Sequence, residues 1–415
     1  MIRYGIVGIG GFAATWVRCL EELEREEIAR LAAAVVRRPD HYRERVERLR
    51  AAGCAIYPDL GTMLAAGRDS LDVIGVPTGI AHHEPMATRA MEAGYNVLIE
   101  KPVAGTVQEV RRLQEVELRT GRWCAVGYQW LHSPTARWIV SRLTTGALGR
   151  VREARAMIAW PRDSVYYGRN AWAGQLRDGD RWILDGPATN ATAHYLTQLL
   201  YYVAAGQGRP IAIEAVRAEL YRARSIPSYD TSCIEVRMPG GARVLHYVSH
   251  ALSRQSDPVI HLQCEGGILD WTGDGDVAGI RYSDGRQEHY ANPAPERVHA
   301  LPLEQTARVA ARVDPVPLCG LAEGGPHVLA INLAFESSLG VRGIPADLLS
   351  RARTPSGGEL VAVEGMEDAL SQAYAAGVLF SDLDLPWAHA TESVPAAGYD
   401  AFPRDPRLAT ALGPL

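Results

Sequence analysis

The sequence has few of the features that mark several functional classes. Its 415 residues carry 43 Lys and Arg against 48 Asp and Glu, which gives a net charge of −5, and no basic run stands out. Nucleic-acid binders depend on basic surfaces that release counterions, so nucleic acid is not expected as a partner. No apolar stretch approaches the roughly 20 residues of a membrane span, so no membrane is expected either.

Cysteine is scarce, and its distribution is uninformative for metal binding. No C-x-x-C pair is present, so we expect neither a zinc site nor a disulfide framework, and no other metal ion. Reduced thiols in a cytosol are the simpler interpretation. The six residues are Cys19, Cys54, Cys124, Cys233, Cys264 and Cys319. The first residues, Met1–Tyr4, run straight into a strand-like segment and a glycine turn, so no signal peptide is expected and the location is expected to be cytoplasmic.

The chain is long enough for two domains, with 47% hydrophobic and 22% charged residues. Its first part alternates short apolar runs with helix-length segments, which predicts a doubly wound parallel sheet over residues 1–126. The predicted strands are Ile2–Val7, Leu31–Val36, Val73–Val76, Asn96–Ile99 and Cys124–Val126. The predicted helices include Phe12–Glu24, Glu84–Ala93 and Val107–Thr120.

The hydrophobic pattern changes near Val151, and the new pattern predicts an α+β domain over residues 127–386. Strand-like runs separated by tight turns favour an antiparallel sheet. These runs are Val151–Trp160, Ile211–Tyr221, Thr231–Met238, Ala242–Ser249, Val259–Cys264 and Ile268–Trp271. Helices are expected at Ala191–Ala204, Pro326–Leu339 and Gly365–Ala376. Residues 387–415 are rich in proline and predict an extended tail.

The first chemical signal is a G-x-G-x-x-A turn between a strand and a helix. Gly8 permits the tight turn, Gly10 lets a diphosphate approach the backbone, and Ala13 lets the helix pack closely. Gly11 in the same turn is also expected to contact the cofactor. The N–H groups at the helix start, near Phe12, suit phosphate oxygens. Glycines also end many strands by chance, but the order of strand, turn and helix favours a dinucleotide site.

The end of the second strand bears on which dinucleotide is bound. An NAD site usually places Asp or Glu there, whereas this chain has Val36 followed by Arg37 and Arg38. Guanidinium groups grip a phosphate with paired hydrogen bonds, which favours NADP over NAD. The alternative is that both arginines are solvated loop charges.

The triplet Glu100-Lys101-Pro102 follows a predicted strand, and ligands of doubly wound sheets lie beyond the carboxyl ends of the strands. There Lys101 can bind a substrate hydroxyl and help move its proton as hydride leaves the carbon. Taken alone, a lysine in this position is more often a surface charge.

Together these segments resemble the Gfo/Idh/MocA oxidoreductases. The similarity rests on the glycine turn, on Ala93–Leu98 with Glu100-Lys101-Pro102 after it, on Val126–Gln129 and on Gly146–Val151. It implies a Rossmann domain, an open-faced antiparallel sheet domain, and NAD(P)-linked oxidation of sugars, polyols or related alcohols. It also implies homodimers or homotetramers that pack through the sheet face.

The resemblance carries further residues over, with one departure. Lys101 matches the catalytic lysine, and His194 matches the histidine of a D-x-G-x-H-x-x-D element, but Asn190 and Thr197 stand where the family has acids. Positions 190, 194 and 197 share one face of a predicted helix. We expect His194 to act as acid or base and Asn190 to orient a hydroxyl, because an amide cannot take a proton.

Other residues are expected around the two ligands. The resemblance places a group of side chains on the cofactor, namely Pro77, Thr78, His82, His83, Glu100 and Gln129. Aromatic rings mixed with polar groups suit a carbohydrate, so a second group is expected on the substrate, namely Tyr128, Tyr167, Arg169, Asn170 and Trp172. The alternative for the segment around Trp172 is a packed interdomain loop, and Ser228–Thr231 adds weaker polar candidates.

The main hypothesis is an NAD(P)-dependent oxidoreductase that transfers hydride between the nicotinamide and a sugar, polyol or sugar-derived alcohol. One alternative is an NAD-dependent glycosidase or lyase that oxidises the substrate transiently. Another is a dinucleotide-binding regulator without catalysis, which the loss of both acids motivates.

Overall fold

The computed structural model describes residues 1–67 and 70–413, which form two compact units. The parallel-sheet unit consists of Met1–Ala104, Gln108–Ser133 and Ala294–Gly324. The mixed-sheet unit consists of Gly105–Val107, Pro134–Pro293 and the chain from Gly325 onward. No helix among the described residues is both long and apolar enough to cross a membrane.

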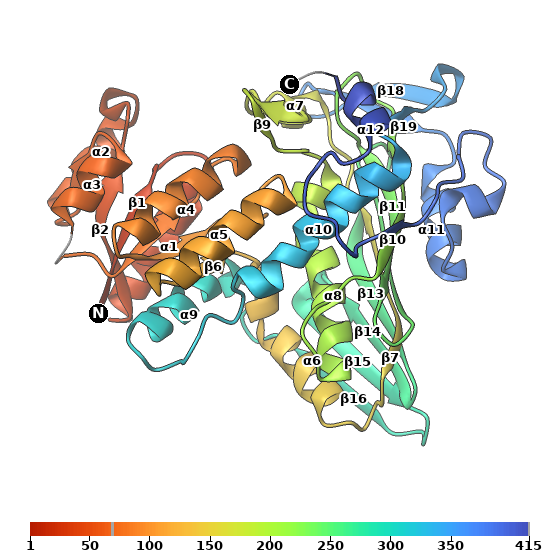
Figure 1. The fold of residues 1–415 in the computed structure, drawn as a ribbon, viewed down its shortest axis with the longest axis horizontal. Coiled ribbons are helices and arrows are strands. Elements are labelled where there is room, and N and C mark those ends of the chain that lie inside the picture. Colours follow the sequence, from red (N-terminus) through yellow and green to blue (C-terminus); the bar gives the residue numbers. More distant parts are fainter. Residues whose placement is uncertain (68–69, 414–415) are drawn as a thin grey trace. The chain divides into compact units, whose positions relative to one another are not determined.

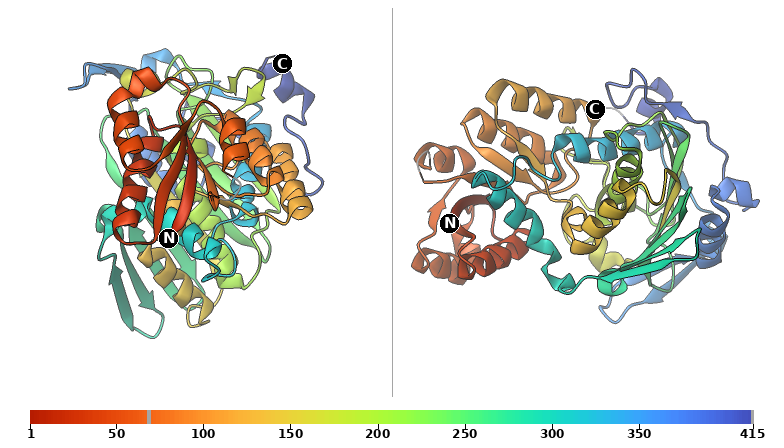
Figure 2. Two further views of the ribbon diagram at one scale, coloured as in Figure 1. Left: turned by 90° about the vertical axis from the view of Figure 1, so that its left-hand side faces the viewer. Right: turned by 90° about the horizontal axis from the view of Figure 1, so that it is seen from below.

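The parallel-sheet unit is built on six parallel strands in the order β3-β2-β1-β4-β5-β6, with helices on both sides (Figure 2). The strands are β1 (Ile2–Val7), β2 (Ala29–Val35), β3 (Ala55–Tyr57), β4 (Val73–Val76), β5 (Asn96–Ile99) and β6 (Cys124–Val126). The helices are α1 (Ala13–Arg25), α2 (Arg43–Ala51), α3 (Leu60–Ala66), α4 (His83–Glu92), α5 (Val107–Thr120) and α9 (Leu301–Ala310). The doubly wound prediction is confirmed.

Burial explains why these strands could be found in the sequence. β4 is buried throughout, as is β5 after Asn96, because helices cover both faces of the sheet and the strands are therefore continuously apolar. Helix α9 comes from a distant part of the chain and carried no such signal. It packs Leu303 and Ala307 into the core around Tyr4, whose hydroxyl donates to the Leu303 carbonyl at 2.8 Å.

The mixed-sheet unit contains a ten-stranded sheet whose main order is β16-β15-β14-β13-β7-β12-β11-β10-β17. The long strands are β7 (Val151–Ala159), β10 (Ala215–Arg222), β11 (Thr231–Met238), β12 (Ala242–Ser249), β13 (Ser256–Cys264), β14 (Gly267–Thr272), β15 (Val277–Tyr282) and β16 (Gln287–Ala291). The short ones are β17 (Arg342–Gly343) and β20 (Val394–Pro395), and β8 (Arg177–Asp178) with β9 (Arg181–Trp182) and β18 (Leu349–Arg353) with β19 (Glu359–Val363) form separate hairpins.

The predicted antiparallel sheet is confirmed for most strand pairs, with one exception among the long strands. The sheet is not antiparallel throughout, because β7 pairs with β12 in parallel. Helix α8 (Ala193–Gln207) and four further strands intervene between these two in sequence, so no tight turn dictates their direction. Consequently β7, β10 and β12 all run the same way and end at the same edge of the sheet.

Helices cover both faces of this sheet (Figure 1). α8 packs on β7 and β12 from one side, together with α6 (Pro134–Thr144) and α10 (Leu321–Ser338). On the other side lie α11 (Met366–Ala376) and the segment after it, which bury Tyr247 and Leu245 of β12. The remaining helices are α7 (Ser164–Tyr167) and α12 (Pro406–Ala411).

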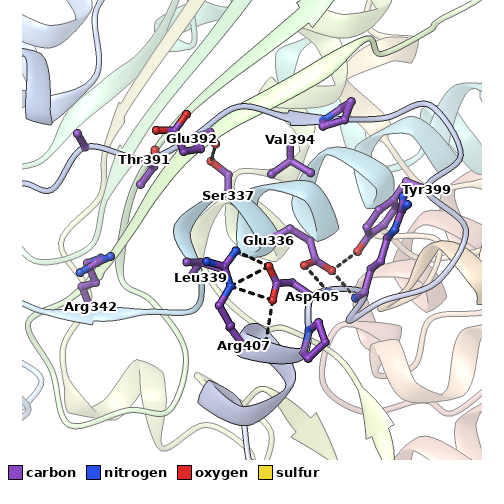
Figure 3. A pocket seen from close by; sticks show the side chains of 14 residues that line it. Glu336, Ser337, Leu339, Arg342, Thr391, Glu392, Val394, Tyr399, Asp405 and Arg407 are labelled. Atoms are coloured by element: carbon purple, nitrogen blue, oxygen red, sulfur yellow. Dashed lines mark hydrogen bonds and ion pairs between the residues drawn. The ribbon is translucent and has the colours of Figure 1, made fainter.

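The proline-rich end of the chain, predicted as an extended tail, runs along the mixed-sheet unit. β20 pairs with β10, and the Phe402 ring lies edge-on to Trp182 at 5.4 Å. Glu336 at the end of α10 is buried and accepts hydrogen bonds from the Tyr399 hydroxyl at 2.8 Å and from the backbone N–H of Arg404 at 2.6 Å (Figure 3). A third bond comes from the N–H of Asp405 at 3.1 Å, so one carboxylate fastens the tail.

Replacing Glu336 by alanine is therefore expected to destabilise the mixed-sheet unit by roughly 3 kcal/mol, because three donors lose their acceptor. Urea unfolding measures the loss, and limited proteolysis should then cut between residues 396 and 413. Glu392→Ala is the matched control, since this exposed tail carboxylate has no recorded side-chain partner among the described residues. Equal stability of the two variants would contradict the conclusion that Glu336 holds the tail on the mixed-sheet unit.

Candidate functional site

The glycine turn joins β1 to α1 in a backbone conformation that glycine favours. Gly8 has φ +92° and Gly11 has φ +53°. The N–H groups of residues 10–13 donate to no recorded partner among the described residues, and α1 has neither a side-chain cap nor an acidic residue in its first turn. Free donors at the positive end of a helix fit an anion, so a diphosphate suits this turn.

Tyr42 and Arg45, which follow β2 in the chain, contact the glycine turn. Neither residue was predicted from the sequence. A Cβ on Gly10 would lie 2.2 Å from the Tyr42 hydroxyl oxygen, so this glycine makes room for Tyr42 rather than for a ligand alone. Arg45 on α2 donates to the carbonyl of Ile9. Both side chains therefore border the free N–H groups.

The two arginines predicted to select NADP lie just beyond the carboxyl end of β2. Arg37 and Arg38 are exposed, and neither forms an ion pair with any residue that the structure describes. β2 neighbours β1 in the sheet, so these arginines and the glycine turn share one edge. Their guanidinium groups remain available for a phosphate.

Lys101 follows β5 at the same edge, two strands from the glycine turn, or about 10 Å at ordinary strand spacing. It is the only lysine among the 43 Lys and Arg residues of the sequence. Arginine keeps its proton at all physiological pH values, whereas lysine can give one up. The single lysine therefore stands where a proton-transferring cation would be useful.

Glu100 lies next to this lysine and supports its backbone. Its buried carboxylate accepts from Trp16 Nε1 at 3.1 Å and from the Lys101 backbone N–H at 3.1 Å. Burial raises the pKa of Glu100 to about 7, against the lowering effect of the Lys101 charge and of these hydrogen bonds.

His83 fastens the loop that carries Lys101. Its ring is fully buried, with Nδ1 2.8 Å from the Pro102 carbonyl oxygen and Nε2 3.0 Å from that of Thr78. Burial lowers the pKa of His83 to about 4, so the neutral ring has one N–H and donates to only one of these carbonyls at a time. Its ring is thus placed against protein backbone rather than toward a cofactor.

The other predicted residues of this unit differ in exposure. His82 is exposed and Thr78 half-buried, whereas Pro77 and Gln129 are buried. Tyr128 is fully buried, and its ring lies against Gly324 in the core, where an added Cβ would approach it to 3.3 Å. The structure therefore places Tyr128 in the core rather than at a surface open to substrate.

Phe12 and His299 form an unforeseen border of the glycine turn. Phe12 is 44% exposed, and its ring lies edge-on to His299 with centroids 5.9 Å apart. His299 comes from the segment that also supplies α9, and burial together with the charges of Arg18 and Lys101 lowers its pKa. This pairing joins residues far apart in the chain, so no local sequence pattern predicts it.

In the mixed-sheet unit, the expected single helix through Asn190 and His194 is wrong. Residues Pro187–Ala191 form a π-helical turn, Thr192 has φ −115°, and α8 begins at Ala193. The turn is held by Tyr229, whose hydroxyl accepts from the Thr189 N–H at 3.0 Å. Asn190 therefore lies before the helix rather than on the face of His194.

A carboxylate that sequence analysis did not single out lies beside Asn190. Asp185 is buried, accepts from Asn190 Nδ2 at 2.9 Å and from the Gly174 N–H at 2.7 Å, and lies 4.0 Å from Arg169. The acid missing at position 190 thus has a counterpart five residues earlier. His194 is buried in the first turn of α8, and Thr197 is bonded to its own helix through the Ala193 carbonyl at 2.8 Å.

The residues of the aromatic segment predicted to bind substrate make two kinds of contact. Asn170 is used internally, because its oxygen accepts from the N–H groups of Trp172 at 3.1 Å and Ala173 at 2.8 Å. Arg169 stacks on the Tyr166 ring with 3.7 Å to the centroid, and Tyr167 contacts His250 at 3.1 Å through its hydroxyl. The rings and guanidinium of this segment are thus gathered in one place.

Comparisons with known proteins agree with this fold and these motifs. Residues 2–128 match the family described as "Oxidoreductase family, NAD-binding Rossmann fold". The parallel-sheet unit is therefore a Rossmann domain of the nucleotide-binding class. Over residues 2–128 the matched family is the Gfo/Idh/MocA oxidoreductase family that the sequence motifs resemble.

Two curated relatives match part of the chain. The dTDP-3,4-didehydro-2,6-dideoxy-alpha-D-glucose 3-reductase of Actinomadura kijaniata is 29% identical over 180 residues, 43% of this chain and 52% of that protein. The alpha-N-acetylgalactosaminidase of Bacteroides fragilis is 25% identical over 181 residues, 42% of this chain and 41% of that protein. The chain thus spans about half, or less, of the length of these relatives.

Solved structures share the fold over most of the chain. The WlbA dehydrogenase from Bordetella pertussis in complex with NADH and UDP-GlcNAcA has a TM-score of 0.65 at 23% identity, covering 81% of this chain and 96% of that one. A 3-ketoreductase from Actinomadura kijaniata, in complex with NADP and TDP-benzene, has a TM-score of 0.65 at 20% identity, covering 83% and 98%.

The raised pKa of Glu100 predicts a pH dependence of stability. Because the folded protein binds this proton more tightly than the unfolded chain, the stabilisation is complete below about pH 4 and is lost as the pH rises through about 7. Glu100→Gln should therefore shrink the difference in unfolding free energy between pH 5 and pH 8, by an amount on the order of 2 kcal/mol.

Urea unfolding of both proteins at the two pH values measures this difference. The exposed Glu115 of α5 provides the control variant Glu115→Gln, which should keep the wild-type pH dependence. An unchanged pH dependence in Glu100→Gln would show that the buried carboxyl does not take up a proton on folding.

Proposed function

We propose that the protein is an NAD(P)-dependent oxidoreductase that transfers hydride between the nicotinamide and a sugar, polyol or sugar-derived alcohol. The observation that carries the proposal is the shared edge of one parallel sheet, where free N–H groups after β1 and the only lysine of the chain after β5 lie two strands apart. The family match over residues 2–128 supports it.

The glycine turn would hold the diphosphate, and Arg37 and Arg38 the 2′-phosphate of NADP, which is preferred over NAD. The cofactor supplies the hydride acceptor or donor, and the chain supplies position and polarity. Relatives with this fold are described in complex with NADP and with NADH, so their names support either dinucleotide.

Lys101 would bind the reacting oxygen of the substrate and exchange its proton. His83 and Glu100 fix the backbone on both sides of this residue, which keeps the amine in place without contacting the reacting atoms. A positioned acid or base of this kind contributes typically about 100- to 10,000-fold in rate.

His194 would serve as the second acid or base, and Asn190 would orient the substrate. Asp185 fixes the amide of Asn190 and can set how its carbonyl oxygen is presented. This chain has Asn190 where the family has an acid, and Asp185 would then supply the negative charge from a neighbouring position.

The substrate class follows from the relatives' names and from the rings of the mixed-sheet unit. One relative is a reductase of a dTDP-sugar, and a fold relative was solved with UDP-GlcNAcA. We infer a carbohydrate-like substrate for this chain, with a cytoplasmic location and no nucleic-acid partner.

A homodimer or homotetramer through the sheet is part of the same proposal. α11 covers β7 and β12 on the face away from α8, so such an interface would use β13–β16. Analytical ultracentrifugation tests the oligomeric state.

A redox-neutral reaction is the second candidate, because several relatives are named glycosyl hydrolase family 109 proteins. Such an enzyme would oxidise a ring carbon, eliminate the aglycone, add water to the resulting double bond and return the hydride. Release of p-nitrophenol from a p-nitrophenyl glycoside with a trace of NAD, without net NADH, would select this candidate. A dinucleotide-binding regulator would show tight cofactor binding without either reaction.

The role of Lys101 predicts that Lys101→Arg loses most activity although the positive charge is kept. An arginine cannot exchange a proton at neutral pH, so kcat should fall by roughly 100- to 10,000-fold while NADPH affinity changes little. The reverse exchange at an exposed position, Arg122→Lys, is the control. Retention of most of kcat in Lys101→Arg would refute proton transfer by this residue.

The cofactor preference predicts the behaviour of Arg37→Gln/Arg38→Gln. NADPH affinity should fall by roughly 10- to 100-fold, and NADH affinity should not change, because only the 2′-phosphate loses charge-assisted bonds. Calorimetric titration measures both affinities. Arg43→Gln/Arg50→Gln removes two charges from neighbouring α2 and should leave the preference intact. Equal losses for both dinucleotides would contradict the phosphate contact.

A further inference from the structure

Basic and aromatic side chains gather where three strands of the mixed sheet end. β7, β10 and β12 run in the same direction, so the loops after Ala159, Arg222 and Ser249 meet at one edge. We call this group the arginine–tyrosine cluster, and it consists of Arg162, Tyr166, Tyr167, Arg169, Arg224 and His250.

The guanidinium groups of the cluster lie on aromatic rings. Tyr166 carries Arg169 at 3.7 Å and Arg162 at 5.1 Å from its ring centroid. Arg224 lies 5.3 Å from the Tyr167 ring. It is tied to the neighbouring loop through a hydrogen bond to the Arg162 carbonyl. Stacking of this kind fixes the cations in place without neutralising them.

The carboxylates near the cluster mostly accept hydrogen bonds from other groups rather than pair with its arginines. Within the described residues, neither Arg162 nor Arg224 has a carboxylate oxygen within 4 Å, and Arg169 has Asp185 at 4.0 Å. Asp230 is buried and accepts from the backbone N–H groups of Ala223 and Arg224. Asp163 is bonded to Thr354 at 2.7 Å and to Ser356.

Several donors inside the cluster lack a partner. His250 is 1% exposed, and its Nε2 has no hydrogen-bond partner among the described residues; the same holds for Nε of Arg162 and Arg224. Burial and the three arginines keep the pKa of His250 well below its usual range, so the ring is neutral. When Nδ1 accepts from the Tyr167 hydroxyl at 3.1 Å, Nε2 carries the proton and can donate.

Buried unsatisfied donors in one place call for an acceptor. We propose that the arginine–tyrosine cluster binds an anionic group, a carboxylate or a phosphate, carried by the sugar substrate. Planar guanidinium groups give such a group paired hydrogen bonds, and the tyrosine rings suit the apolar face of a sugar. The inference rests on the proposed function and narrows its substrate class to acidic or phosphorylated sugars.

Calorimetric titration of the full-length protein with four compounds tests the inference, once with saturating NADPH and once without. Glucuronate supplies the carboxylate, glucose 1-phosphate and UDP-glucose supply phosphate, and glucose supplies neither. We expect at least one anionic compound to bind tenfold or more tightly than glucose, and the tighter arm identifies the anionic group.

Variants of Arg162 locate the binding. Arg162→Gln should weaken that anionic compound roughly 10- to 100-fold, Arg162→Lys should weaken it less, and glucose should not respond. Arg254→Gln removes one exposed charge elsewhere in the same unit and should have no effect. Arg169→Gln, at an exposed position, gives the second variant if Arg162→Gln proves unstable.

Glucose binding as tightly as every anionic compound would overturn the inference, as would equal weakening of all four compounds by Arg162→Gln. Oxidation of neutral sugars or polyols with NADP⁺ in that case would leave the proposed function standing. Failure of both NADPH and NADH to bind would instead refute the proposed function, and the titrations without cofactor would still decide whether the cluster holds an anion.

Discussion

The candidate site depends on the parallel pairing of β1, β4 and β5. Parallel strands present their carboxyl ends at one edge, so this pairing brings the free N–H groups after β1 close to the lysine after β5. The supporting contacts then act locally. His83 joins the loops after β4 and β5, and Glu100 holds the backbone of Lys101.

A similar principle organises the second unit. The parallel pairing of β7 with β12 departs from the antiparallel pairing of the other long strands, and it makes three strand ends coincide. The arginine–tyrosine cluster forms there, while the π-helical turn held by Tyr229 carries Asn190 toward Asp185. The residues that we propose for the chemistry of this unit thus come mostly from strand ends and turns.

Much of this could be predicted from sequence where the determinants are local. The bounds of β4, β5, β6 and α5 follow from continuous apolar runs and helical spacing, and the glycine turn follows from residue order. Long-range determinants left no such trace. Tyr42 over Gly10, His299 beside Phe12 and Asp185 beside Asn190 depend on tertiary pairing, and the π-helical turn replaces a helix that the spacing around His194 favoured. α10 begins five residues before its predicted start, because Glu323 caps Gly320 and Pro326 is tolerated within the helix.

The presence of a single lysine allows the central claim to be tested directly. Reductive methylation with ¹³C-formaldehyde labels the amine of Lys101 and the N-terminal amine, and NMR resolves the two. If a nicotinamide ring binds beside residue 101, NADPH shifts the Lys101 signal, whereas adenosine 2′,5′-bisphosphate, which lacks the nicotinamide end, leaves it in place. A Lys101 signal that does not move at saturating NADPH would contradict the account.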